Sequence, residues 1–214
     1  MATLSLRVVD LFQGDRATDF GQAAGGGVWG IIHKASTGAT GWDRKYAERR
    51  PNALAAGLLW GAYHWGTHIE VKRQVDNFLK RADPDENTLV ALDYEADAGS
   101  QMTLEQAREF LTRISEKLGR KAVLYSGHVA KDALGNRKDA FFGSHRLWLS
   151  QYGERPSVQK SWDSFWLWQY TDGKDGPDKP FPDTVPGLPG DSRGRLDCNS
   201  YLGAKDQLKR EWAS

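Results

Sequence analysis

Short apolar segments alternate with helical segments through the first 126 residues, and this alternation limits the possible folds more than any other feature. Each apolar segment has the length and composition of a buried strand. The five segments are residues 4–11, 28–34, 58–64, 88–94 and 121–126. A strand followed by a helix and a second strand is the repeating unit of parallel α/β sheets. The sequence therefore predicts five successive βα units.

Two of the intervening segments have clear helical patterns. In TLEQAREFLTRISEKLG, residues 103–119, apolar side chains recur every three or four residues, and Thr103 with Gln106 forms a capping box. Gly119 stands where a C-terminal cap belongs. Residues 71–82 also place their apolar side chains on one helical face. Residues 43–56 have a helical pattern too, but we expect that helix to bend or restart at Pro51.

The pattern changes after Ser126. Two segments, RLWLSQYG and SFWLWQYTDG, predict strands that are joined by loops. The Pro- and Gly-rich residues 177–195 predict an irregular surface loop, and a last short strand is expected at residues 195–198. Five βα units and three further strands favour an α/β fold, a single modified TIM-like barrel that forms one domain over residues 1–214. A doubly wound open sheet competes with it, but no G-x-G-x-x-G follows the first strand.

Composition excludes several classes of function. The chain has 214 residues, with 29 basic and 28 acidic side chains, so its net charge of +1 gives no electrostatic case for nucleic acid as the main partner. It has no apolar stretch of membrane-spanning length. A single cysteine, Cys198, excludes an intrachain disulfide framework. Nine tryptophans suit a core, and they also suit a groove that stacks on flat ligand faces.

Three of the predicted strands end in acidic residues. The first ends at Asp10, and the fourth, in LVALDYEA, ends at Asp93 with Glu95 two residues later. The last strand ends near Asp197. Because the C-terminal ends of barrel strands meet at one face, we expect these four carboxyl groups to surround one cavity.

Four carboxylates around a cavity either bind a hard cation or perform acid–base chemistry. A cation site usually takes several oxygen ligands from one acidic loop, which this sequence lacks, so we expect no metal and no cofactor. Crowded acids raise one another's pKa, which can keep one carboxyl group protonated near neutral pH while its neighbour is charged. Glycoside cleavage requires this combination, and the acids therefore predict a glycosidase.

Other catalytic arrangements fit the sequence less well. His64 and His68 are four residues apart, but HWGTH lacks the glutamate of the H-E-x-x-H zinc motif. Cys198 follows Asp197 directly, so we expect it to point to the opposite face as a packed thiol. No G-x-S-x-G motif supports a serine hydrolase. The competing class is a catalytically silent binding module with a barrel fold, which would have no need of all four acids.

Eight segments together resemble the family 25 glycoside hydrolases, the Chalaropsis-type lysozymes or muramidases. In chain order they are VVDLFQG, GIIHKASTG, AAGLLWGAYHW, LVALDYEA, KAVLYSG, LWLSQYG, WLWQYTDG and LDCNSYLG. The resemblance implies a flattened barrel of five βα units and three further strands. It also implies cleavage of the β-1,4 bond between N-acetylmuramic acid and N-acetylglucosamine in peptidoglycan.

The resemblance also assigns roles to individual residues. Glu95 matches the general acid of the family, and Asp93, Asp10 and Asp197 match the acids that accompany it. Two positions depart from the family pattern: Phe12 replaces the usual serine two residues after the first aspartate, and KASTG runs straight to Gly38 where a glutamate is usual. Neither departure touches a proposed catalytic acid, but both lie where they could alter the rim of the groove.

Several aromatic and polar residues lie at or near predicted strand ends and are candidates for substrate binding. Core packing is the default interpretation for the tryptophans, including Trp168. The resemblance places several members of the set beside the sugar, and the tyrosine and glutamine side chains carry polar atoms that need partners. Lys34 could pair with the acids or neutralise the cluster. The substrate-binding candidates are Tyr63, Tyr125, Trp148, Tyr152, Gln169 and Lys34.

The biological setting is weakly constrained. The N-terminus lacks the charged and long apolar regions of a signal peptide, so we expect synthesis in the cytoplasm followed by release or delivery to the cell wall. A phage endolysin, a secreted antibacterial effector and an exported housekeeping wall hydrolase whose signal precedes Met1 all fit, and an effector would have an immunity protein as partner. We expect a monomer that acts on peptidoglycan glycan strands. Two mechanisms stay open, a carboxylate nucleophile and assistance by the 2-acetamido group of the substrate.

Overall fold

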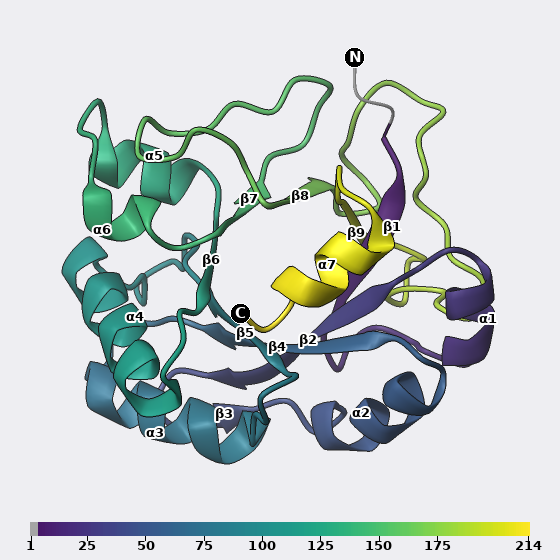
Figure 1. Cartoon of the computed structure of the whole chain (residues 1–214), viewed down its shortest axis with the longest axis horizontal. Coiled ribbons are helices and arrows are strands. Elements are labelled where there is room, and N and C mark those ends of the chain that lie inside the picture. Colours follow the sequence, from purple (N-terminus) through teal and green to yellow (C-terminus); the bar gives the residue numbers. More distant parts are fainter. Residues whose placement is uncertain (1–3) are drawn as a thin grey trace.

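Eight strands of the computed structural model, which describes residues 4–214, close into a barrel (Figure 1). The order around the barrel is β1-β9-β8-β7-β6-β5-β4-β2, and the pairing of β1 with β2 closes it. The strands are β1 (Leu6–Leu11), β2 (Gly30–Thr37), β4 (Leu59–Trp65), β5 (Leu89–Asp93), β6 (Val123–Ser126), β7 (Leu147–Ser150), β8 (Leu167–Thr171) and β9 (Asp197–Ser200). The expected modified TIM-like barrel is confirmed.

The first five barrel strands are each followed by at least one helix, as the sequence predicts. The helices are α1 (Phe20–Gly25), α2 (Tyr46–Ala55), α3 (Val71–Ala82), α4 (Leu104–Leu118), α5 (His128–Leu134), α6 (Ala140–Gly143) and the C-terminal α7 (Lys205–Glu211). A short extra strand, β3 (Gly41–Trp42), pairs antiparallel with the end of β2. No helix among residues 4–214 is long and apolar enough to cross a lipid bilayer.

The last strand breaks the parallel pattern. β7 is parallel to β6 and β8 is parallel to β7, whereas β9 runs antiparallel to both β8 and β1. No helix separates β7 from β8, and the expected irregular loop lies between β8 and β9. β9 covers Asp197–Ser200, two residues later than the expected 195–198.

Local signals place the helix ends well. The capping box of α4 forms as predicted: Gln106 N donates to Thr103 Oγ1 at 3.2 Å, and Thr103 N donates to Gln106 Oε1 at 2.9 Å. Gly119 ends this helix in the left-handed conformation, with φ of 67°. The expected restart at Pro51 is wrong, because α2 continues through Pro51. A proline removes one helical hydrogen bond, and burial of Tyr46 and Ala53 on the same helix favours keeping it continuous.

The core has two layers separated by the barrel wall. Side chains from alternate positions of each strand pack outward against the helices, and the other set fills the barrel interior. In β5, for example, Leu89 and Ala91 point inward, whereas Val90 and Leu92 point outward. Helix α7 lies across one end of the barrel (Figure 1), where the indole of Trp212 donates to the carbonyl of Trp60 at 2.7 Å. The other end of the barrel is left open.

Candidate active site

A pocket of about 250 Å³ occupies the open end of the barrel, at the C-terminal ends of the parallel strands. Its position is the one in which β/α barrel enzymes carry their active sites. The structure brings together in this pocket all ten residues that the sequence singled out, and it adds two more. The lining residues are Asp10, Phe12, Lys34, Tyr63, Trp65, Asp93, Glu95, Tyr125, Trp148, Tyr152, Gln169 and Asp197.

Strand alternation explains how these side chains converge. Asp93 continues the inward-facing set of β5 that begins with Leu89 and Ala91, and Asp10 follows Val8 in the same way on β1. Glu95 lies two residues beyond the end of β5, in the loop. The sequence placed Asp197 at the end of a strand, and this prediction is wrong, because Asp197 begins β9. It reaches the same face because β9 is antiparallel, which pairs Asp197 with Asp10.

A hydrogen-bond network fixes the side of the pocket around Asp10. Gln169 Nε2 donates to both carboxylate oxygens of Asp10 at 3.1 Å, and Asn199 Nδ2 donates to Oδ1 at 2.7 Å. The hydroxyl groups of Tyr125 and Tyr152 donate to Gln169 Oε1 at 2.8 and 3.1 Å. Both tyrosines are thereby held in the pocket through a chain of contacts that ends on Asp10.

The floor of the pocket is aromatic. Trp148 is buried, and its Nε1 donates to Asn199 Oδ1 at 2.6 Å. Its ring meets the rings of Tyr125 and Tyr63 edge to face, with centroids 4.5 and 6.3 Å away. Trp168, on the neighbouring strand β8, belongs to the outer layer of the core, as the default interpretation of the tryptophans predicts. The pocket floor is therefore both apolar and rigid.

The pKa values of Asp93 and Glu95 are both raised, but different neighbours add to or oppose the rise. Asp93 is 4% exposed, and its Oδ1 has no hydrogen-bond partner within residues 4–214. Burial raises the pKa of Asp93 well above its ordinary value, the charge of Glu95 raises it further, and Lys34 opposes the rise. Burial also raises the pKa of Glu95, and the hydroxyl groups of Tyr125 and Ser150 oppose that rise. For Glu95, burial and not the crowding of acids is thus the main cause.

The remaining two acids have raised pKa values as well. Burial raises the pKa of Asp10 to about 6, although the amides of Asn199 and Gln169 act against it. Burial also raises the pKa of Asp197 well above its ordinary value, and the charge of Asp10 adds to the effect. All four acids therefore hold their protons to higher pH than isolated carboxyl groups do.

Lys34 supplies positive charge to the pocket without a direct ion pair. Within residues 4–214 its Nζ makes no salt bridge, and it lies 4.5 Å from the ring centroid of Trp65 and 6.0 Å from that of Tyr63. Burial lowers its pKa, while Asp93 is the strongest of the charges that raise it. Of the two roles left open for this lysine, neutralising the acids at a distance fits this geometry better than pairing with one of them.

Sequence reasoning missed two residues of the site. Asn199, which contacts Asp10, lies two positions after Asp197 and could have been found from strand alternation. Trp65 ends β4 two positions after Tyr63 and carried the same signal. Phe12, which the sequence placed at the rim of the groove as a departure from the family pattern, does line the pocket and is 40% exposed, in a turn after β1.

The turn that carries Phe12 is held by a buried arginine. Arg49 Nη1 donates to the carbonyl oxygen of Phe12 at 3.0 Å and to His33 Nε2 at 2.9 Å, and Arg49 Nη2 donates to the carbonyl oxygen of Asp15. The carboxylate of Asp15 accepts from Phe12 N at 2.7 Å. The rim beside Phe12 is therefore a fixed part of the pocket.

The other chemistry-bearing residues are structural. His64 is fully buried, with Nδ1 on Ser36 Oγ at 2.8 Å and Nε2 on Gln74 Oε1 at 3.2 Å, so neither ring nitrogen is free for a metal. Cys198 is buried in the outer core layer, as expected. No group of three or more His, Cys, Asp or Glu side chains among residues 4–214 is arranged to hold a metal ion.

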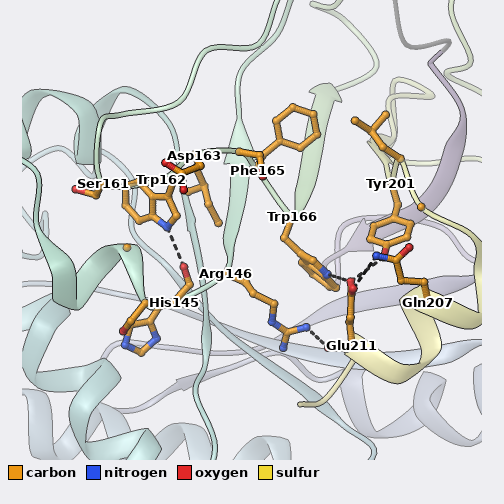
Figure 2. A pocket seen from close by; sticks show the side chains of 16 residues that line it. His145, Arg146, Ser161, Trp162, Asp163, Phe165, Trp166, Tyr201, Gln207 and Glu211 are labelled. Carbon is orange, nitrogen blue, oxygen red and sulfur yellow. Dashed lines mark hydrogen bonds between the residues drawn. The ribbon is translucent and has the colours of Figure 1, made fainter.

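A larger cleft, of about 570 Å³, lies at the opposite end of the barrel beside α7 (Figure 2). In this cleft the carboxylate of Glu211 accepts hydrogen bonds from Trp166 Nε1 at 2.9 Å, from Tyr201 Oη at 2.7 Å and from Gln207 Nε2 at 2.9 Å. Arg146 donates to the carbonyl oxygen of Glu211 and stacks on Trp166. Because these polar groups already satisfy one another, the acidic pocket is the candidate active site.

Comparisons with known proteins identify the fold and the family. The bacterial lysozyme from Streptomyces coelicolor shares the fold with a TM-score of 0.82 and 21% identity, over 98% of this chain and 97% of that one. The family GH25 lysozyme from Aspergillus fumigatus has a TM-score of 0.77 and 22% identity, over 98% of this chain and 99% of that one. A family 25 glycosyl hydrolase from Bacillus anthracis has a TM-score of 0.77 and 18% identity, over 97% of this chain and 93% of that one. A search of curated proteins finds no significant match. The sequence model of the glycosyl hydrolases family 25 matches residues 9–178. The chain therefore belongs to family 25 of the glycosyl hydrolases and is a glycoside hydrolase.

Proposed function

We propose that the protein is an N-acetylmuramidase, which hydrolyses the β-1,4 bond between N-acetylmuramic acid and N-acetylglucosamine in peptidoglycan. The observation that carries the proposal is the pair Asp93 and Glu95 in one pocket, with an unpartnered oxygen of Asp93 buried beside them. Membership of family 25 and the lysozymes among the structural neighbours support the same substrate.

Glu95 is the general acid in this proposal. It is partly exposed at the pocket, where it can reach a glycosidic oxygen, and burial raises its pKa so that it keeps its proton toward neutral pH. The proton passes from the Glu95 carboxyl group to the leaving oxygen as the bond to the anomeric carbon breaks. Glu95 then takes a proton from the water that completes hydrolysis.

Asp93 assists the attack that displaces the leaving group while Glu95 protonates it. In the substrate-assisted route, the carbonyl oxygen of the 2-acetamido group attacks the anomeric carbon and forms a cyclic oxazolinium intermediate, which water then opens. The carboxylate of Asp93 lines the pocket and, when charged, is suited to accept the amide N–H and to stabilise the positive charge that develops there. The competing route has Asp197 or Asp93 as a carboxylate nucleophile that forms a covalent glycosyl ester.

Asp10 acts by positioning other groups. Both of its oxygens already accept hydrogen bonds from Gln169, so it is poorly placed to attack a sugar. Through Gln169 it orients the hydroxyl groups of Tyr125 and Tyr152 toward the substrate. The faces of Trp148 and Tyr63 provide the apolar floor on which a sugar ring lies, and Lys34 moderates the charge of the acids.

Product analysis tests the reaction. Digestion of purified cell walls should release fragments with new reducing ends at muramic acid, and EDTA should leave the rate unchanged. The Glu95→Gln variant should lose several orders of magnitude in kcat while its thermal unfolding stays close to that of the native chain. New free amino groups with intact glycan would instead identify a peptidase or amidase. Binding to walls without any release of fragments would identify a silent binding module.

Two measurements separate the mechanisms. A substrate without the N-acetyl group cannot assist its own cleavage, so the native enzyme should fail on it while a carboxylate nucleophile would still act. The Asp93→Asn variant should keep its fold and lose orders of magnitude in kcat, because the amide cannot stabilise the developing charge. Trapping of a covalent glycosyl adduct on Asp93 or Asp197 would refute substrate assistance.

A further inference from the structure

A second surface of the molecule gathers basic side chains around two adjoining hollows. The hollows, of about 380 and 340 Å³, lie between β3, the start of α2 and the outer face of α3, and they share Lys80 and Arg81. Figure 1 shows these three elements side by side at the bottom of the view. The basic residues that line the hollows are Arg44, Arg73, Lys80 and Arg81. We call these four residues the α3 basic patch.

The charges of the α3 basic patch are not paired. Within residues 4–214 none of its four members forms a salt bridge, whereas the adjacent Lys45 and Lys72 pair with Glu48 and Asp76 at 2.8 and 2.7 Å. Of the acids that line the hollows, Asp76 is therefore already paired. The other, Asp43, is buried and accepts backbone hydrogen bonds. The four basic side chains of the patch outnumber the two acids that line the hollows, so the potential over the hollows is positive.

The frame of the patch is rigid. The guanidinium of Arg81 stacks over the ring of Trp42 at 3.5 Å, and it donates no hydrogen bond to any of residues 4–214, with Nε buried and unpartnered. Asn77 Nδ2 donates to the carbonyl oxygens of Gly38 and Gly41 at 3.0 and 2.8 Å, which ties the turn before β3 to α3. Because Nε is buried, the two Nη groups of this stacked guanidinium are the ones that can contact phosphate.

The patch adjoins the catalytic pocket. Trp42 pairs with Ser36 near the C-terminal end of β2, the strand that carries Lys34 into the pocket. Asp43 links the two sites, because its backbone N–H donates to Ala35 O at 3.0 Å and its Oδ2 accepts from Gln13 N at 2.6 Å, next to Phe12. A polymer attached to a glycan strand in the pocket could therefore continue onto this surface.

We propose that the α3 basic patch binds a phosphate-bearing polymer of the bacterial wall while the glycan occupies the pocket. The choice of this occupant rests on the proposed function, since the wall is where such a polymer is linked to the glycan. Charge complementarity favours it: unpaired cations spread over two adjoining hollows match phosphate groups repeated along a chain. A neutral sugar chain would need no such cations.

Binding of polyglycerol phosphate to the full chain tests the proposal. The double variant Arg73→Gln with Lys80→Gln should bind about tenfold more weakly or worse, and native binding should fall steeply between low and physiological salt. The matched control is Lys45→Gln with Lys72→Gln, which removes the same charge from neighbouring positions already in ion pairs. The control should change affinity by less than about twofold.

Three outcomes would overturn the proposal. Equal losses in the two double variants would mean that only net charge matters, and no loss in either would mean that the polymer binds elsewhere. Tighter binding to anionic lipid vesicles or to DNA than to polyglycerol phosphate would assign the patch to another partner. Walls stripped of phosphodiester polymers test the muramidase proposal separately, because both double variants should digest them at the native rate. Failure of the native chain on stripped walls would refute the muramidase and leave the binding result standing.

Discussion

Replacement of Asp10 by asparagine should make the fold more stable at neutral pH while it impairs the active site. Asp10 is 5% exposed, and its charge is tolerated through hydrogen bonds from Gln169 and Asn199. Asparagine has the same shape, but its amide nitrogen would face the amide nitrogen of Gln169. Gln169 must then rotate, which disturbs the hydroxyl groups of Tyr125 and Tyr152 that depend on it.

The size of the effect follows from the pKa of Asp10. Burial raises that pKa from 3.8 to about 6. A rise of about two pH units corresponds to roughly 3 kcal/mol of folding free energy. Below pH 3.8 the carboxyl group is protonated in both states and contributes nothing. Between pH 3.8 and 6 the unfolded chain loses the proton while the folded chain keeps it, so the native protein loses stability as pH rises, and the loss is complete above pH 6.

Urea unfolding followed by tryptophan fluorescence measures this difference. Between pH 4 and pH 7.5 the free energy of unfolding of the Asp10→Asn variant should gain roughly 3 kcal/mol relative to the native chain. Asp139→Asn is a flat control: Asp139 caps α6 and pairs with Arg108, and its pKa is lowered below 3.8, so its contribution is lost only below that pH and this variant should run nearly parallel to the native chain between pH 4 and pH 7.5. Parallel pH curves for the native and Asp10→Asn proteins would refute the reasoning.

Three further substitutions have defined outcomes. Lys34→Met removes the charge that lowers the pKa of Asp93, so the acid limb of the kcat profile should move to higher pH, and an unmoved limb would exclude this role. Arg49→Met leaves the buried carbonyl groups of the Phe12 turn without donors and should cost about 2–4 kcal/mol in urea unfolding. Thr103→Ala removes the capping box of α4 and should cost about 1 kcal/mol, with wall digestion unchanged.

Much of the fold could be predicted because strand and helix signals here are local. Apolar runs of four to eight residues gave the first five strands, and the capping box at Thr103 gave one helix end to the residue. The direction of β9 could not be predicted, because it is decided by pairing with β1 and β8, far away in sequence. The continuity of α2 through Pro51 likewise reflects tertiary packing, which local rules do not contain.

The site residues could be predicted where side chains alternate along a strand and the strand ends meet at one face of the barrel. Asp10, Asp93 and Tyr125 follow inward-facing residues on their strands, so alternation alone aims them at one cavity. Phe12 was expected at the rim only from the family resemblance, because the shape of its turn depends on contacts with Arg49 of helix α2, which spacing does not reveal. The causes of the raised pKa values also required the structure, since depth of burial cannot be read from spacing.

Closure of the barrel by β9 has a consequence for biosynthesis. β9 supplies Asp197 and Asn199 to the pocket and pairs with β1, which is made about 190 residues earlier. Until this strand has left the ribosome, Asp10 lacks its amide donor from Asn199, and Trp148 lacks the acceptor that fixes its ring. A nascent or truncated chain thus has an open sheet with an unfinished pocket. Hydrolytic activity should begin only with the last step of folding, after translation has passed Ser200.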